Sequence, residues 1–269
     1  MIQKDGLLAS DMDGTVIPYD QEPERAAEIT EFYRLVHQHA NVCLAYVTGR
    51  HFELGLEGVK EYALPEPHIF VCDVGSTIYL KGNGDWRKDE DYRLRLRNSW
   101  HNLTGSDIAE LLSELPELEP QESFRQKEFK QSYYAAPVVD RKEITEKISR
   151  QLSRAGIKAN IIYSVDVVKH VGLIDVLPVI AAKDYALEYL WRRVGVEKNR
   201  VVYAGDSGND LLAFVSGFNA IVVNNTADDV KQAVRRQITQ KGCADKVFFA
   251  SGNYVQGVVE GCRHFGLFP

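Results

Sequence analysis

The sequence predicts an α/β protein built on a doubly wound parallel sheet, with a second, α+β domain inserted into it. Short apolar segments bounded by turn residues alternate with amphipathic helical patterns in the first third of the chain and again in its last third. Between these two parts charged residues are frequent, and strand and helix patterns no longer alternate regularly. A chain of 269 residues is long enough to bury a core in both domains.

The first third of the chain has the strand and helix patterns of βαβ units. A short apolar run from Leu7 to Asp11 has the form of a buried parallel strand, with Asp11 near its carboxyl end. Apolar residues spaced by three and four follow in residues 23–39, which indicates an amphipathic helix. The elements predicted next are the strand 41–47, the helix 52–62 and the strand 68–72.

The inserted domain is predicted to span residues 84–176, which divides the parallel-sheet domain into residues 1–83 and 177–269. Strands that follow and separate helices in the insertion favour an antiparallel α+β sheet. The elements predicted there are helices at 107–114 and 141–155 and strands at 129–136, 159–165 and 170–176.

From residue 177 the strand-helix alternation returns and completes the parallel sheet. Open α/β sheets place their chemistry at the carboxyl ends of the strands, so polar residues that follow a strand are the candidates for a site. The elements predicted here are helices at 182–194, 211–215 and 228–239, strands at 201–204, 220–223 and 247–250, and a closing helix.

The formal net charge of −6 argues against nucleic acid as the main partner, because neutralising its phosphates needs a basic face. A small anionic substrate still fits, since local charge and a bound cation decide its binding. The four cysteines lack the close spacing of a zinc site or a disulfide framework. The sequence shows neither the apolar core of a signal peptide nor a run of membrane-spanning length. We therefore expect reduced thiols, no membrane partner and a cytoplasmic location.

Four polar segments follow predicted strands or begin a predicted helix. The first is Asp11-Met12-Asp13-Gly14-Thr15, in which Gly14 lets the chain leave the strand sharply. Taken alone, this segment also fits an ordinary Asp-Gly turn. The other three are Tyr46-Val47-Thr48-Gly49-Arg50, Lys183, and Gly205-Asp206-Ser207-Gly208-Asn209-Asp210.

These four segments, in this order, resemble the four motifs of the haloacid dehalogenase-like (HAD) phosphohydrolases. The resemblance implies a Rossmann-like core with an inserted cap domain. It also implies that Asp11 is a nucleophile that forms an aspartyl-phosphate, and that Asp13 is first the general acid and then the general base. Thr48 is implied to donate a hydrogen bond to the phosphoryl oxygens, and Lys183 to supply a positive charge there.

A magnesium ion is expected in the same site. Asp11 and Asp206 add negative charge beside an anionic substrate, and Mg²⁺ is a hard cation that takes oxygen ligands. The resemblance implies three ligands, namely the Asp11 side chain, the Asp13 backbone carbonyl and the Asp206 side chain. Asp210 is counted with the metal-site residues, and Asn209 and Asp210 are expected to orient ligands or water. The aspartate turn also fits the cap of the helix that follows it.

Two further segments narrow the resemblance to the sucrose-phosphate phosphatase family. They are Val74-Gly75-Ser76, which follows the third strand, and Lys130-Gln131-Ser132-Tyr133 in the inserted domain. The resemblance then covers nearly the whole chain and implies a magnesium-dependent phosphatase that acts on a phosphorylated disaccharide or related glycoside. The residues assigned to substrate binding are Gly49, Arg50, Gly75, Ser76, Lys130, Ser132 and Asn209.

Several residue assignments have alternatives at this point. Lys130, Ser132 and Tyr134 alternate along one strand, which fits a sugar-binding face and nearly as well a half-exposed strand. Arg50 fits a contact with phosphate or sugar and equally an ion pair with a surface carboxylate. Trp86, assigned to the inserted domain, fits stacking on a sugar or packing in a core.

The sugar and the phosphate acceptor are also open. His51 and Asp73 depart from the family pattern, so the phosphates of mannosylfructose, glucosylglycerol and glucosylglycerate are alternative substrates. An acceptor sugar is an alternative to water. Outside the enzymes, the alternative is a non-catalytic sugar-phosphate-binding partner of a synthase, and a sugar-phosphate synthase is the protein partner to consider for the enzyme as well.

Overall fold

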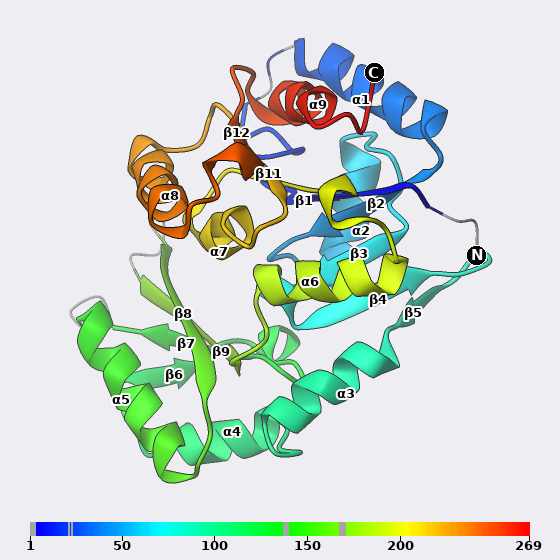
Figure 1. Cartoon of the computed structure of the whole chain (residues 1–269). Coiled ribbons are helices and arrows are strands. Elements are labelled where there is room, and N and C mark those ends of the chain that lie inside the picture. The colour runs from blue at the N-terminus through cyan, green and yellow to red at the C-terminus, as the bar shows by residue number, and fades with distance from the viewer. Residues whose placement is uncertain (1–3, 21, 23, 137–139, 167–170) are drawn as a thin grey trace. The chain divides into compact units, whose positions relative to one another are not determined.

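The computed structural model describes residues 4–20, 22, 24–136, 140–166 and 171–269 (Figure 1). The chain forms two compact units. The first, here called the core unit, contains Met1–Lys88 and Lys183–Pro269, and the second, the inserted unit, contains Asp89–Ala182. None of the helices in the described ranges has the length and apolar character needed to cross a membrane.

The core unit is built on one mostly parallel sheet. Its strands are β1 (Gly6–Ser10), β2 (Val42–Val47), β3 (Ile69–Cys72), β4 (Thr77–Lys81), β5 (Trp86–Lys88), β10 (Val201–Gly205), β11 (Asn219–Val222) and β12 (Val247–Phe249). Their order across the sheet is β12-β11-β10-β1-β2-β3-β4-β5. Neighbours from β12 to β3 are parallel, and β4 and β5 extend the β3 edge antiparallel. The predicted α/β fold class is confirmed.

Helices cover both faces of this sheet (Figure 1). One face is covered by α1 (Glu24–Gln38), α2 (Phe52–Glu61) and α9 (Tyr254–His264), whose apolar side chains share one cluster with those of the strands. On the other face, α6 (Lys183–Val194), α7 (Leu211–Phe214) and α8 (Asp228–Lys241) pack in sequence. Every residue of β1 is buried, because a strand covered on both faces has no solvent side.

The predicted site residues follow neighbouring strands of the core sheet. β10, β1, β2 and β3 lie side by side and parallel, with Ser10 level with Ala204 on one side and with Tyr46 on the other. Their carboxyl ends therefore share one edge of the sheet. The residues that leave β1, β2, β3 and β10 converge there, at the place where an open α/β sheet binds its ligand.

The inserted unit is an α+β layer with an antiparallel sheet. Its strands are β6 (Leu118–Pro120), β7 (Gln131–Ala135), β8 (Ala159–Asp166) and β9 (Val171–Pro178), in the order β6-β7-β9-β8. Its helices are α3 (Glu90–Ser99), α4 (Gly105–Leu112) and α5 (Arg141–Arg154). In α5 the buried residues Ile144, Ile148 and Leu152 recur every fourth residue and form the apolar stripe of this helix, which faces the interior of the inserted unit.

The structure contains β4, β5, α3 and β6, which the sequence patterns did not predict. Only Tyr92 and Leu96 of α3 are buried, so its apolar stripe is too short to stand out among the charged residues. Trp86 was assigned to the inserted domain, and this assignment is wrong. It lies on β5 of the core unit, with its ring 5.4 Å from that of Phe70 and 5.5 Å from that of Phe52.

The core unit extends past residue 83, the predicted end of its first part. β5 pairs with β4 and so belongs to the core sheet, and the inserted unit begins at Asp89. At the other boundary β9 continues to Pro178 beside β8, and the inserted unit ends at Ala182 rather than at residue 176. Pro23 and His170, which were predicted to begin a helix and a strand, lie outside the described residues.

Candidate active site

The centre of the site is a buried lysine that contacts two buried aspartates. Lys183 Nζ lies 2.7 Å from Asp11 Oδ2 and 2.7 Å from Asp210 Oδ1. Asp206 completes a cluster in which one carboxylate oxygen from each aspartate lies within 4.8 Å of the others. Three carboxylates thus face one ammonium. This excess of negative charge in a buried place favours a bound cation.

Asp11 follows β1 and is held by the backbone on both sides. Its amide donates to the carbonyl of Ala204 at 2.9 Å, and its Oδ1 accepts a hydrogen bond from the amide of Met12 at 2.8 Å. Burial raises the pKa of Asp11 to about 7; Lys183 opposes this rise, and the charges of Asp210 and Asp206 add to it. The side chain is therefore oriented, and Lys183 favours its charged form.

Both carboxylate oxygens of Asp210 are already occupied by donors. Oδ1 accepts hydrogen bonds from Lys183 at 2.7 Å and from the Tyr203 hydroxyl at 2.5 Å. Oδ2 accepts from the amides of Asp206 and Ser207 at 3.1 and 2.9 Å. A Cβ on Gly205 would lie 2.6 Å from Asp210 Cγ, so only glycine fits there. Asp210 thus fixes Lys183 and the turn that carries Asp206.

Asp206 has one anchored oxygen and one that faces the turn after β1. The Thr15 hydroxyl donates to Oδ1 at 2.9 Å, while Oδ2 lies 2.2 Å from the position that a Cβ on Gly14 would take. Gly14 has φ +76°, so both its backbone conformation and the space beside it require glycine. Burial raises the pKa of Asp206 to about 6; the Thr15 bond opposes the rise, and the Asp210 charge adds to it.

Asp13 is more exposed than Asp11 and pairs with Arg50. Arg50 Nε donates to Asp13 Oδ2 at 2.8 Å, and Nη2 donates to Oδ1 at 2.5 Å. Arg50 Nη1 also donates to the carbonyl of Leu54 at 3.2 Å. Of the alternatives for Arg50, the structure shows the ion pair with a carboxylate. That carboxylate belongs to another predicted catalytic residue.

Thr48 and the turn after β3 form the next part of the site. Thr48 is buried, and its Oγ1 accepts a hydrogen bond from the amide of Arg50 at 3.1 Å. No hydrogen bond donated by its hydroxyl is found among the described residues. The amide of Val74 donates to the carbonyl of Thr48 at 3.1 Å. Asp73 and Val74 have φ values of +51° and +60°, a strained conformation for residues with a Cβ.

Gly49, Gly75, Ser76 and Asn209 are also brought to the core unit's strand ends. Gly75 has φ +94°, in the left-handed region that favours glycine. The Ser76 hydroxyl is buried and has no hydrogen-bond partner within the described part of the chain. Asn209 is exposed, and its Oδ1 accepts from the Ser207 hydroxyl at 2.9 Å.

The predicted sugar-binding residues of the inserted unit pair with one carboxylate of that unit. The hydroxyl of Ser132, on β7, donates to Asp175 Oδ1 at 2.5 Å, and Lys130 Nζ lies 3.6 Å from Asp175 Oδ2. Ser132 is buried. The Tyr134 hydroxyl instead donates to Glu122 Oε1 at 2.9 Å. Lys130 and Ser132 are thus brought together, while Tyr134 is part of a separate contact.

Sequence reasoning missed the roles of Tyr203 and Thr15 and the nature of the contact between Arg50 and Asp13. Tyr203 lies in the apolar pattern of β10, so nothing in the sequence distinguishes its hydroxyl from that of a core tyrosine. Thr15 stands in the first motif, and its hydroxyl was a signal that could have been used. His51 differs from the family pattern, yet its Nδ1 accepts from the amide of Leu54 at 3.4 Å and caps α2.

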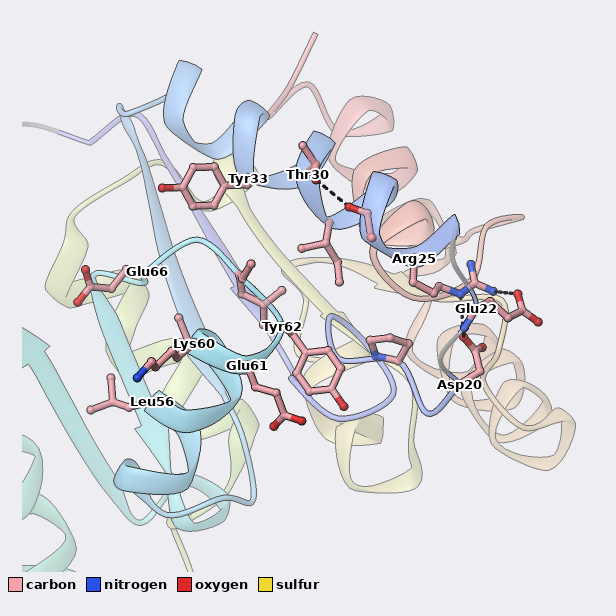
Figure 2. Close-up of a pocket in the computed structure, with 16 residues that line it drawn as sticks. Asp20, Glu22, Arg25, Thr30, Tyr33, Leu56, Lys60, Glu61, Tyr62 and Glu66 are labelled. Carbon is pink, nitrogen blue, oxygen red and sulfur yellow. Dashed lines mark hydrogen bonds and ion pairs between the residues drawn. The ribbon is translucent and has the colours of Figure 1, made fainter.

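A separate pocket lies between α1 and α2, and the predicted site residues do not line it. It has a volume of about 1100 Å³, and Leu56 and Tyr33 are among the residues that line it. Its rim is acidic, and Figure 2 shows Arg25 of α1 paired with Asp20 and Glu22 at one end. An acidic rim is unsuited to a phosphate group, so this pocket is distinct from the site described above.

A family model for sucrose-6F-phosphate phosphohydrolase matches residues 4–266. A relative from Nitrosococcus oceani, named as a HAD-like hydrolase, is 35% identical over 96% of this chain and 71% of its own. Mannosylfructose-phosphate phosphatase of Agrobacterium fabrum is 26% identical over 98% of both chains.

Among solved structures, the sucrose-phosphatase of Synechocystis sp. PCC6803, in complex with sucrose and phosphate, has a similar fold. The TM-score is 0.77, with 24% identity over 98% of both chains. This likeness supports the fold, and the match of the family model over nearly the whole chain supports the activity class. The chain belongs to the sucrose-6F-phosphate phosphohydrolase family, and it is a HAD-type phosphoric monoester hydrolase.

Proposed function

We propose that this enzyme removes phosphate from a phosphorylated disaccharide or glycoside by transfer of the phosphoryl group to Asp11. The observation that carries the proposal is the contact of the buried Lys183 with Asp11. It orients one carboxylate at the carboxyl end of the sheet and favours its charged form against the effect of burial. A carboxylate held in this way is suited to attack phosphorus.

In the first step, Asp11 forms a bond to phosphorus while the bond from phosphorus to the ester oxygen breaks. Asp13 gives a proton to the departing alkoxide, which leaves as the free sugar. In the second step, Asp13 takes a proton from water, that water attacks the phosphorus of the aspartyl-phosphate, and the bond from phosphorus to the Asp11 oxygen breaks. The products are inorganic phosphate and Asp11 in its original form.

The neighbouring residues supply donors for the phosphoryl oxygens. We assign the free hydrogen of Thr48 and the third N–H of the Lys183 ammonium to these oxygens. Arg50 does not need to touch the phosphate in this scheme. Its two bonds to Asp13 orient the acid-base residue relative to Asp11.

The donor set fits Mg²⁺, since the buried aspartates offer hard oxygen ligands and carry more charge than Lys183 neutralises. We propose the side chains of Asp11 and Asp206 and the backbone carbonyl of Asp13 as protein ligands. Asp210, whose oxygens are filled by other donors, would position these groups. When bound, Mg²⁺ would neutralise charge on the phosphoryl oxygens and on the two carboxylates.

The substrate class rests on the family. Sucrose 6-phosphate is the first candidate, and the phosphates of mannosylfructose, glucosylglycerol and glucosylglycerate are the others. The buried hydroxyl of Ser76 has no hydrogen-bond partner among the described residues, which supports a role in binding polar groups of the substrate. We include Gly49, Gly75, Lys130, Ser132 and Asn209 with it. The free cysteines support a cytoplasmic location. The protein partner we propose is the synthase that makes the phosphorylated sugar, because it supplies the substrate of this reaction.

Asp11→Asn is expected to lower phosphate release from the best of these four sugar phosphates by about 10³-fold or more, because an amide is a poor nucleophile. Phosphate release is measured in Mg²⁺, and Asp229→Asn on the surface of α8 serves as the matched control. Circular dichroism checks that both variants fold. Unchanged activity in Asp11→Asn would refute the assignment, and binding of the sugar phosphates by the wild type with no turnover would refute hydrolysis itself.

Mg²⁺ is expected to raise the melting temperature more at high pH than at low pH. The raised pKa values, about 7 for Asp11 and about 6 for Asp206, mean that the folded protein binds protons more tightly than the unfolded chain. Without metal, these two groups therefore make folding less favourable as the pH rises through this range. A cation binds their charged forms, so its stabilising effect grows over the same range.

The measurement is the difference in melting temperature between Mg²⁺ and chelator at pH values of about 5 and 8. Asp206→Asn should remove most of the difference at the higher pH. A difference that is equal at both pH values, or larger at the lower one, would contradict the proposed ligand set.

Arg50→Gln is expected to lower kcat by about 10- to 100-fold and to change KM little, because the lost contact orients Asp13 rather than the substrate. Arg50→Lys should recover only part of the loss, since an ammonium cannot make the two parallel bonds. Arg34→Gln on α1 is the control for loss of a surface ion pair. A large rise in KM at unchanged kcat would instead show that Arg50 binds the substrate.

A further inference from the structure

The loop that follows the first motif is anchored on both sides of Tyr19. On its early side, the amide of Gly14 donates to the carbonyl of Ile17 at 2.8 Å, and Ile17 is buried in the core cluster. On its late side, Arg25 of α1 pairs with Asp20 at 3.1 Å, as Figure 2 shows. The backbone that carries Tyr19 is therefore held in place.

Tyr254, at the start of α9, adds a second anchor to this loop. Its ring lies beside the arginine that pairs with Asp20, with the guanidinium carbon of Arg25 5.1 Å from the ring centroid. Asn225 connects the start of this loop to the start of α9. Its Nδ2 donates to the Gly14 carbonyl at 2.7 Å, and its Oδ1 accepts from the amide of Tyr254 at 2.8 Å. Tyr254 has φ +46°, a conformation that costs energy in a residue with a Cβ and that these contacts offset.

The ring of Tyr19 is exposed although its backbone is held. The residue is 72% exposed, more than any other large apolar or aromatic residue found exposed in the described ranges. Exposing an aromatic ring to water is unfavourable, and a fixed loop exposes this ring at one defined position. Such an exposed apolar surface is typical of a binding site.

That place is beside the carboxylate cluster. Tyr19 Cε2 lies 2.7 Å from the position that a Cβ on Gly14 would take, and Asp206 Oδ2 lies 2.2 Å from the same position. The ring of Tyr19 therefore borders the aspartates without adding to their charge.

We infer that the ring of Tyr19 is a stacking surface for the sugar unit that carries the phosphate. The inference rests on the proposed function, since it concerns the same reaction. A sugar ring has a face of C–H groups, which packs favourably on the negative face of an aromatic ring. In this arrangement the phosphate binds Lys183 and Thr48. The sugar attached to it leaves the carboxylate cluster beside Asp206 and so lies against the Tyr19 ring.

The test compares Tyr19→Ala with the wild type on two substrates in Mg²⁺. One is the sugar phosphate that the wild type hydrolyses best among the four named above, and the other is acetyl phosphate, which has no sugar. Tyr19→Ala is expected to raise KM for the sugar phosphate by about 3- to 10-fold and to leave kcat/KM for acetyl phosphate within about 2-fold. Tyr19→Phe, which keeps the ring, is expected to behave like the wild type.

The controls separate this inference from the proposed function. Tyr33→Ala removes another exposed tyrosine, on α1, and should change neither substrate's kinetics. Equal losses on both substrates in Tyr19→Ala would overturn the inference, because the ring would then serve the phosphate site. An equal loss in Tyr19→Phe would assign the effect to the hydroxyl, and no change in Tyr19→Ala would assign the ring no role. If the wild type hydrolyses neither substrate, the proposed function fails first, and the inference fails with it.

Discussion

The site depends on the buried ammonium of Lys183, which lies between Asp11 and Asp210. Burial alone lowers the pKa of a lysine, but the charges of these two aspartates outweigh burial and raise the pKa of Lys183. Removing one partner from a buried ion pair typically costs about 3–5 kcal/mol, since the other charge is left without compensation. Lys183 thus connects the start of α6 to the strand that ends at Asp11.

The fold brings these groups together at a cost in backbone strain. Gly14 and Gly205 leave space for the carboxylates of Asp206 and Asp210, and a side chain at either position would collide with them. Asp73 and Val74 adopt left-handed conformations, each of which costs about 1–3 kcal/mol. Their amides bond to the carbonyls of the Thr48–Arg50 segment, which holds the strained turn against the end of β2. Strain collected at one end of a sheet is typical of a functional site.

Most of the core fold could be predicted because its signal is local. Burial can be predicted directly from the apolar runs of β1, β2 and β10 and from the apolar stripe of α1. The short β5 and the charged α3 carry few buried residues, so their pairing with other elements, which the sequence does not show, decides their structure. The motifs likewise indicated Asp11, Lys183 and Asp206 by their order along the chain.

What the sequence could not show is which side chains meet. Tyr203 looks like any core residue of an apolar strand, and only the fold reveals that its hydroxyl bonds to Asp210. From the sequence, Arg50 fitted a contact with phosphate, a contact with sugar or an ion pair with a carboxylate. The structure shows its guanidinium paired with Asp13. Both contacts join residues on different elements, so no spacing along the chain encodes them.

The central claim is that phosphate passes through Asp11, and the most direct measurement is to find it there. The enzyme is mixed with its sugar phosphate in Mg²⁺, quenched in acid within one turnover, digested and analysed by mass spectrometry. We expect a phosphoryl group on the peptide that contains Asp11, at the aspartate that contacts Lys183. A phosphoryl group on another residue, or rapid phosphate release with no phosphorylated peptide at any quench time, would contradict it.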